Sequence, residues 1–204
     1  MMGTRIMAGE LRGMHIGPLP KDILARPILA RIKKSVFDII KNRLPDAKFL
    51  DLFSGSGTVG FEALSRGASK VVMIDANPKS ARWLQQTYFA MGRKNPWVAR
   101  QRLDVHCANV MSGLAWLNDR FDIIFSGAPY VDKDKKALFF IDDLLASIPR
   151  DNVLSDKGWF VAQHHQRETF TAPANWDFFR QEKYGDTRVS FFRYAAPKTE
   201  APQP

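Results

Sequence analysis

The stretch DLFSGSGTVG, residues 51–60, decides the fold of this chain of 204 residues. It follows an apolar run, KFLDLF, that predicts a buried strand, and it leads into GFEALSRG, which predicts a helix. Gly55, Gly57 and Gly60 match the spacing G-x-G-x-x-G, and Asp75 ends the next apolar run about 20 residues further on. A strand, a glycine loop and a helix in this order predict a nucleotide-cofactor site.

Runs with strand and helix character alternate along the rest of the chain. The expected strands cover residues 48–53, 71–75, 103–108, 121–126 and 158–165, and the expected helices cover 60–67, 78–91, 110–117 and 135–148. This alternation predicts an α/β fold with a doubly wound, Rossmann-like and mostly parallel sheet. WDFFRQEKY and TRVSFFRY, which the dipeptide GD joins, predict an antiparallel C-terminal hairpin.

The amino-terminal part differs from this body in charge. Residues 5–17 predict a short β-hairpin, and residues 26–44 have helical spacing. Residues 1–48 hold ten basic and four acidic side chains, so they carry +6 of the formal net charge of +9. We expect three parts: a basic docking extension (1–46), a cofactor-binding domain (47–195) and a disordered Pro-rich tail (196–204).

Composition excludes several classes of protein and site. Cys107 is the only cysteine, which excludes an internal disulfide and a thiolate zinc site, and the scattered histidines predict no metal site. No apolar run approaches the roughly 20 residues that span a bilayer, and the amino terminus lacks the apolar segment of a signal peptide. We expect a cytoplasmic monomer with no membrane partner.

The residues around the glycine loop discriminate between cofactors. A dinucleotide brings a pyrophosphate, which bare backbone N–H groups bind, whereas S-adenosylmethionine has no phosphate and carries a positive sulfonium. Asp51, before the glycines, suits the cationic ligand better. Asp75 suits the ribose of either cofactor, and Asn109 fits either an adenine contact or a turn cap.

Four stretches together resemble the RsmD family of bacterial 16S rRNA guanine-N2 methyltransferases. They are RIMAGELRG, ARPILARIKKSVFDII, DLFSGSGTVGFEALSRGA and YGDTRVSFF, and the resemblance covers about residues 4–194. It implies a class I methyltransferase fold, S-adenosylmethionine as the cofactor, and 16S rRNA or a small-subunit assembly intermediate as the partner. Carried over by position, the cofactor-binding residues would be Asp51, Phe53, Ser54, Gly55, Ser56, Gly57, Asp75, Ala76 and Asn109.

FSGAPY, residues 125–130, takes the place of the family's catalytic motif, which is usually D-P-P-Y or D-P-P-F. The first motif residue normally accepts a hydrogen bond from the reacting amine, and Gly127 has no side chain to do so. The carbonyl of Ala128 remains as an acceptor, Pro129 can stiffen the turn and Tyr130 can stack on the base. Loss of one such polar group typically costs about 10²–10³ in rate. A slowed enzyme, a degenerate binding relative and an enzyme for another base amine all remain open.

The basic extension is the expected RNA-docking element. Its side chains would contact phosphates, which contribute affinity but little sequence reading. For the helical lysines the alternative is an ordinary solvated helix face. The expected RNA-binding residues are Arg5, Arg12, Arg26, Arg31, Lys33 and Lys34.

Overall fold

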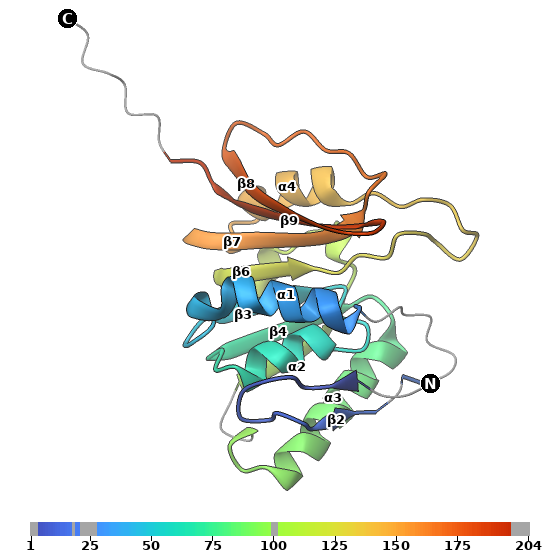
Figure 1. Ribbon diagram of the computed structural model, residues 1–204, viewed down its shortest axis with the longest axis vertical. Helices are drawn as coiled ribbons and strands as arrows, with labels where there is room; N and C mark the ends of the chain where they lie inside the picture. The colour runs from blue at the N-terminus through green and yellow to red at the C-terminus, as the bar shows by residue number, and fades with distance from the viewer. Residues whose placement is uncertain (1–3, 18, 21–27, 99–101, 197–204) are drawn as a thin grey trace, which may run out of the picture.

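The computed structural model, which describes residues 4–17, 19–20, 28–98 and 102–196, contains a seven-stranded sheet (Figure 1). The strand order is β5-β4-β3-β6-β7-β9-β8. The first five strands of that order run parallel, and β9 runs antiparallel to both β7 and β8. The strands are β3 (Lys48–Leu52), β4 (Lys70–Asp75), β5 (Arg102–Cys107), β6 (Phe121–Ser126), β7 (Leu154–His165), β8 (Trp176–Tyr184) and β9 (Thr187–Tyr194). The predicted α/β fold and C-terminal hairpin are confirmed.

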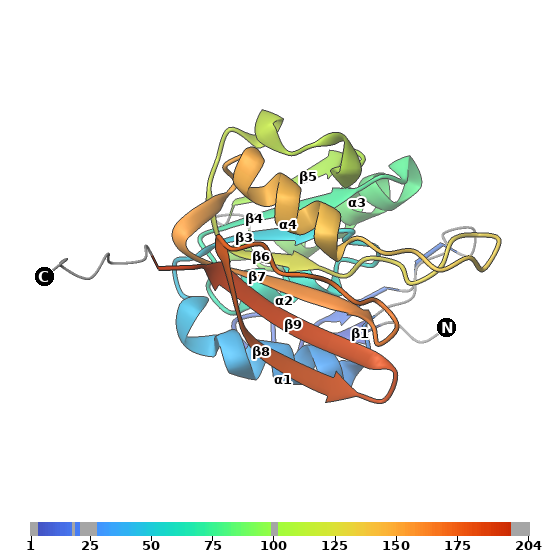
Figure 2. The same cartoon turned by 90° about the horizontal axis from the view of Figure 1, so that it is seen from above.

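Helices cover both faces of this sheet, with α1 and α4 on opposite sides (Figure 2). One face packs against α1, α2, α3 and a two-stranded hairpin, and the other packs against α4 and two short 3-10 helices. The elements are β1 (Thr4–Arg5), β2 (His15–Ile16), α1 (Ala30–Ile40), η1 (Lys41–Arg43), α2 (Thr58–Ser65), α3 (Pro78–Lys94), η3 (Val110–Ser112), η4 (Ala115–Leu117) and α4 (Ile141–Arg150). Among the described residues, no helix is long and apolar enough to cross a membrane.

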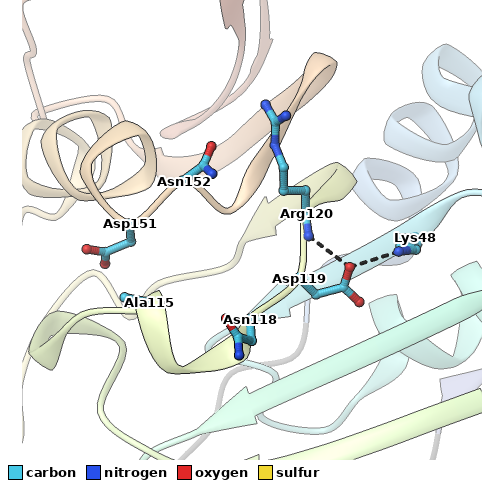
Figure 3. Close-up of a pocket in the computed structure, with 7 residues that line it drawn as sticks. All are labelled: Lys48, Ala115, Asn118, Asp119, Arg120, Asp151 and Asn152. Atoms are coloured by element: carbon cyan, nitrogen blue, oxygen red, sulfur yellow. Dashed lines mark hydrogen bonds and ion pairs between the residues drawn. The ribbon is translucent and has the colours of Figure 1, made fainter.

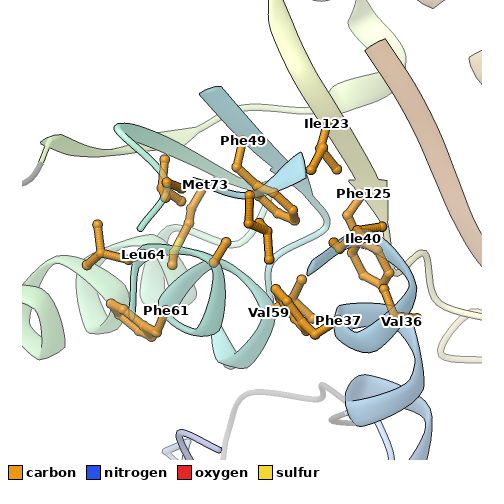
Figure 4. Packing of buried hydrophobic residues seen from close by; sticks show 14 of the residues in the cluster. Val36, Phe37, Ile40, Phe49, Val59, Phe61, Leu64, Met73, Ile123 and Phe125 are labelled. Atoms are coloured by element: carbon orange, nitrogen blue, oxygen red, sulfur yellow. The ribbon is translucent and has the colours of Figure 1, made fainter. Parts of the chain in front are cut away.

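Alternating side chains on the strands separate the two cores. On β3, Phe49 points to the face with α1, where its ring stacks on Phe37 at 6.4 Å between centroids. Its neighbour Leu50 points to the face with α4. The first core is drawn in Figure 4, where α2 contributes Phe61 and Leu64. Both faces of β3 are therefore buried, as an inner parallel strand requires.

The amino-terminal hairpin packs into the first core through its apolar side chains. Ile6, Leu11 and Ile16 are at most 2% exposed and belong to the same cluster as α1 and α2. The Leu11 amide donates to Ser65 Oγ on α2 at 2.9 Å. The hairpin is thereby held close to the helix that follows the glycine loop.

One expected helix begins later than its sequence pattern indicates. The spacing predicts a helix over 135–148, but α4 covers Ile141–Arg150. Glu168, distant in sequence, accepts hydrogen bonds at Oε1 from the amides of Phe140 and Ile141, at 2.6 and 2.8 Å, and so fixes the first turn. A tight turn on Asp132, which accepts from the amides of Asp134 and Lys136, occupies the residues before it.

The expected helix over 110–117 is also wrong in detail. The chain forms two 3-10 helices, η3 and η4, on either side of Gly113, whose φ of 100° an ordinary residue rarely adopts. Strand β7 begins at Leu154, four residues before the expected start at 158. The remaining expected strands lie within one residue or two of their predicted ends.

Candidate active site

The glycine loop and the GAPY segment meet at one point of the sheet. From β3 the chain moves outward through β4 to β5 and then returns to the other side of β3 with β6. In open α/β sheets, ligands bind outside the carboxyl ends of the strands where the order reverses in this way. Leu52 and Ser126 pair at the ends of β3 and β6, and the amide of Gly127 donates to the Leu52 carbonyl at 3.4 Å.

The glycine loop is a tight wrap between β3 and α2. Phe53, Gly55 and Gly57 all have positive φ, at 58°, 50° and 67°. The Ser54 amide donates to the carbonyl of Ile74 at 2.9 Å, which attaches the loop to β4. A Cβ on Gly57 would lie 2.4 Å from Leu84 Cδ2, so the loop needs glycine there for both space and conformation.

Asp51 is a buried acid beneath this loop. Its side chain is 2% exposed, and Oδ2 accepts a hydrogen bond from the Gly60 amide in α2 at 3.0 Å. Burial is the main cause that raises the pKa of Asp51 to about 8, and the nearby Asp75 raises it further. A buried carboxyl of this kind becomes easier to ionise when a positive charge binds nearby.

Asp75 connects the end of β4 to the glycine loop. Its Oδ2 accepts from the Gly55 amide at 2.8 Å, and its Oδ1 accepts from the Asn77 amide at 2.9 Å. The side chain is half-buried, and Ala76 beside it is exposed. The carboxylate therefore has a fixed orientation at the carboxyl end of β4, beside the point where the strand order reverses.

Asn109 lies just past the carboxyl end of β5, on the same side of the sheet as the ends of β3 and β4. It is exposed, and its Oδ1 accepts from the Met111 amide at 3.0 Å, which caps η3. This hydrogen bond directly supports the interpretation of Asn109 as a turn cap. The cap uses only the oxygen, so an adenine contact would come from the Nδ2 amino group.

Tyr130 is fixed through its hydroxyl rather than through its ring alone. Gln163 on β7 donates from Nε2 to the Tyr130 hydroxyl at 2.8 Å, and that hydroxyl donates to Thr187 Oγ1 on β9 at 3.3 Å. The His165 ring meets the Tyr130 ring edge-on at 5.8 Å between centroids. The sequence pattern gave no sign of these three partners, because β7 and β9 reach Tyr130 only through the topology of the sheet.

The rest of the GAPY segment supplies backbone groups. Gly127 and Ala128 are half-buried, and Pro129 is exposed. A Cβ built on Gly127 would lie 3.2 Å from the Phe125 ring, so a side chain fits only if that ring moves by a few tenths of an ångström. Asp132 cannot easily replace the missing acid, since its carboxylate closes the turn described above.

Four of the six expected RNA-binding residues are exposed. Arg5 and Arg12 lie on the hairpin, and Arg31 and Lys34 lie on α1, where Lys34 pairs with Asp38 at 2.6 Å. Arg26 lies outside the described residues. The tail expected at 196–204 is described only at its first residue.

Lys33 corrects the prediction. It is 3% exposed, and its ammonium lies 3.2 Å from Glu62 Oε2 and donates to the carbonyl of Arg5 at 3.2 Å. Burial lowers the pKa of Lys33, and Glu62 opposes that shift. Helical spacing placed Lys33 off the apolar face, but the hairpin and α2 cover that side of α1. The side chain is therefore structural and is not available to a phosphate.

The hollow drawn in Figure 3 lies at the opposite side of the sheet, near the amino-terminal ends of the strands. It has a volume of about 470 Å³ and is lined in part by Lys48, Asp119 and Arg120, which precede or begin strands. Burial raises the pKa of Asp119, but hydrogen bonds from Lys48 and Lys70 outweigh it and lower the value to about 2. Asp119 thus ties β3 and β4 together, and this hollow is far from the switch point.

Comparison with known proteins decides the family. The family model described as Conserved hypothetical protein 95 matches residues 4–193, nearly the whole chain. The chain belongs to this family. The match confirms the resemblance to RsmD proteins, and the members of this RsmD family have the class I methyltransferase fold that the sheet order displays.

Individual relatives of this RsmD-family chain are distant but cover it almost completely. Ribosomal RNA small subunit methyltransferase D of Escherichia coli strain K12 is 27% identical over 94% of this chain and 90% of its own length. The solved structure of the Escherichia coli protein yhhF, provisionally named a methyltransferase, has a TM-score of 0.76 at 23% identity and covers 96% and 99% of the two chains. SMU.776, solved in complex with SAH, matches at a TM-score of 0.56 and 14% identity over 76% of this chain and 48% of its own.

Proposed function

We propose that this RsmD-family protein transfers a methyl group from S-adenosylmethionine to the exocyclic N2 amine of a guanine in 16S rRNA. The observation that carries the proposal is the junction of β3 and β6, where the Gly127 amide donates to the carbonyl of Leu52, the last residue of β3 before the glycine loop. A cofactor on the loop would present its methyl group next to that segment. A named relative that matches over 94% of this chain is a small-subunit rRNA methyltransferase, which supports the choice of RNA.

The residues of the β3 and β4 ends fit S-adenosylmethionine. Asp75 offers a fixed carboxylate to the two ribose hydroxyls, and Asp51 supplies an acid that a cationic ligand would help to ionise. The loop residues Phe53, Ser54, Gly55, Ser56 and Gly57 would surround the methionine part. The bound cofactor supplies an electrophilic methyl group on a positively charged sulfur. Ala76 and Asn109 would border the adenosine end.

The GAPY segment would hold the target base. The Tyr130 ring, fixed by its hydroxyl contacts, offers a face on which an extruded guanine can stack. The backbone carbonyl of Ala128 would accept a hydrogen bond from N2–H and favour the pyramidal form in which the lone pair can attack. Positioning supplies most of the remaining rate, because the methyl donor is already activated.

The exposed basic residues Arg5, Arg12, Arg31 and Lys34 would contact RNA phosphates. Their charge lies in a segment, 1–46, whose hairpin is packed on α2, so it can present them at a fixed place relative to the cofactor loop. We assign this segment the docking role and residues 47–195 the methyl transfer. Neutralising these residues should weaken RNA binding and reduce its salt dependence, with little effect on cofactor affinity.

Methyl transfer to small-subunit rRNA that lacks the modification tests the proposal. The protein is incubated with labelled S-adenosylmethionine and either naked rRNA or partly assembled subunits, and the product is digested and analysed for N2-methylguanine. Binding of S-adenosylhomocysteine (SAH), followed by calorimetry, shows that the cofactor site is intact. No transfer at high protein concentration, with SAH bound, would contradict the proposal.

The second candidate is a binding protein that holds rRNA and cofactor without turnover. The absence of a side chain at Gly127 favours it. An inert native protein whose Gly127→Asp variant methylates rRNA would establish this alternative. Methylation of adenine or cytosine in the same digest would point instead to another base amine.

A further inference from the structure

Gln163 occupies the position on the neighbouring strand that corresponds to Gly127. Ser126 of β6 pairs in parallel with Ala162 of β7, so Gly127 and Gln163 each come one residue further along their strands. Side chains alternate between faces along a strand, and neighbours in register point the same way. A Cβ on Gly127 would meet the Phe125 ring, two residues earlier, which places it on the α1 face of the sheet. Gln163 lies two residues after Val161, which faces the same core.

The amide of Gln163 has one committed end and one uncommitted end. Its Nε2 donates to the Tyr130 hydroxyl at 2.8 Å. Its Oε1 is buried and, among the described residues, is the one buried side-chain oxygen or nitrogen without a hydrogen-bond partner. Buried polar atoms are nearly always paired, and an exception needs a reason such as a catalytic role. The unpaired oxygen is next to the residue on which the base is expected to stack.

We propose that Gln163 Oε1 is the hydrogen-bond acceptor that replaces the side chain missing at Gly127. This rests on the proposed methylation of a guanine amine. A base stacked on the Tyr130 ring would bring its N2–H against this oxygen, which then accepts a hydrogen bond from it. An amide oxygen has the same accepting geometry as a carboxylate oxygen, although it carries no charge.

The chemistry balances without a basic side chain. N2 forms its new bond to the methyl carbon as the bond between that carbon and sulfur breaks, and the electron pair stays on sulfur to give a neutral thioether. N2 then carries one surplus proton, which it releases to water. Gln163 and the Ala128 carbonyl accept hydrogen bonds from the two N2–H groups but take no proton.

The test is a rescue experiment on the full-length protein. Gln163→Leu removes the acceptor and should lower kcat for rRNA methylation by about 10²–10³-fold, as removal of one preorganised polar group does. Adding Gly127→Asp to that variant should restore kcat to within about tenfold, because it returns an acceptor to the same face. Gly127→Ala in the same background adds the Cβ without an acceptor and should not rescue.

Two further variants separate this role from that of merely holding Tyr130. Tyr130→Phe already removes the contact with Nε2, so a positioning role predicts that Gln163→Leu has no further effect in that background, whereas an acceptor role predicts the full loss. Gln181→Leu removes another half-buried amide, one that donates to Ser190 on β9, and should leave kcat unchanged. SAH binding by calorimetry confirms that each variant is folded.

Each outcome decides the matter. If the native protein is active and Gln163→Leu leaves kcat unchanged, the acceptor role is wrong and the proposed function stands. The same holds if Gln163→Leu abolishes activity and Gly127→Asp does not restore it. An inert native protein with an active Gly127→Asp variant shows that Gln163 does not compensate. If SAH binds and no variant transfers methyl groups, the proposed function itself fails.

Discussion

The ends of β3 and β6 lie side by side, yet they are specified in different ways. At the β3 end, the loop contains three residues with positive φ. Ser54 and Asp75 attach it to β4, and the buried Asp51 lies beneath it. The β6 end makes one long backbone hydrogen bond to Leu52, and its aromatic residue is held by side chains of β7 and β9. The proposed cofactor site at the β3 end thus depends mainly on residues close in sequence, whereas the proposed base site at the β6 end depends on distant strands.

The largest expected effect is on the pH dependence of stability, through Asp51 under the β3 loop. Its pKa is raised to about 8 in the folded protein, so the unfolded chain ionises this acid first as pH rises. The free energy of unfolding should fall between about pH 4 and pH 8, by up to about 1.4 kcal/mol per pH unit. Asp51→Asn should remove that fall, as measured by urea titrations across this range.

Asp119 at the far edge of the sheet provides the opposite sign as a control. Its pKa is lowered to about 2, so its contribution to stability is present above about pH 4 and is lost as pH falls toward 2. Asp119→Asn should therefore lower the free energy of unfolding at neutral pH. At pH 2 the variant and the native protein should have nearly the same free energy of unfolding. A slope unchanged in Asp51→Asn would show that the buried acid is not the cause.

Gly57→Ala tests the conformation of the β3 loop. The new Cβ meets Leu84 and Phe61 and has to adopt φ near 67°, so the free energy of unfolding should fall by about 2–4 kcal/mol. Gly185→Ala has a similar φ, of 60°, with no atom within 4 Å of the added Cβ, and should cost only about 1–2 kcal/mol. Equal losses in the two variants, by denaturant titration, would contradict the packing argument.

Asp75→Ala tests the carboxylate that would bind ribose. Loss of a charge-assisted hydrogen bond of about 1.5–3 kcal/mol should weaken SAH binding about 10- to 150-fold in calorimetry. Asp119→Ala removes a carboxylate from the far edge and should leave SAH affinity unchanged. If both variants bind SAH like the native protein, the cofactor does not lie on the β4 end.

Tyr130 tests the β6 end. Tyr130→Ala should raise KM for rRNA by the loss of one stacked base, about 1–3 kcal/mol, while SAH affinity stays the same. Tyr130→Phe keeps the ring and loses the contacts with Gln163 and Thr187, so its effect on KM should be smaller. Equal effects of Phe and Ala would mean that the hydroxyl, rather than the ring, contributes the binding.

The sequence predicted local features well and contacts between distant segments poorly. Glycine spacing and apolar runs were enough for the strand–loop–helix unit and the final hairpin, because these depend on neighbouring residues. The predicted start of α4 was wrong because Glu168, 27 residues later in the sequence than Ile141, caps the helix. Lys33 was misassigned because only the folded hairpin and α2 bury it, and no periodicity of α1 alone indicates that.

The same distinction applies to the candidate site. Asp51 and Asp75 were predicted from their positions at strand ends, and the parallel pairing of β3 with β4 brings those ends together. Gln163 carried no signal, since its relation to Gly127 exists only in the register of β6 and β7. A sequence motif with a missing side chain is therefore an incomplete description of a site that neighbouring strands help to build.

The most direct test of the β6 end as a working site is a single-turnover comparison of the native protein with Gly127→Asp. Both are loaded with labelled S-adenosylmethionine and mixed with unmodified small-subunit rRNA in excess. We predict N2-methylguanine from both proteins, with the variant faster by no more than about tenfold because Gln163 already supplies an acceptor. Methylation by Gly127→Asp alone, or by neither protein with cofactor bound, would contradict a working site in the native chain.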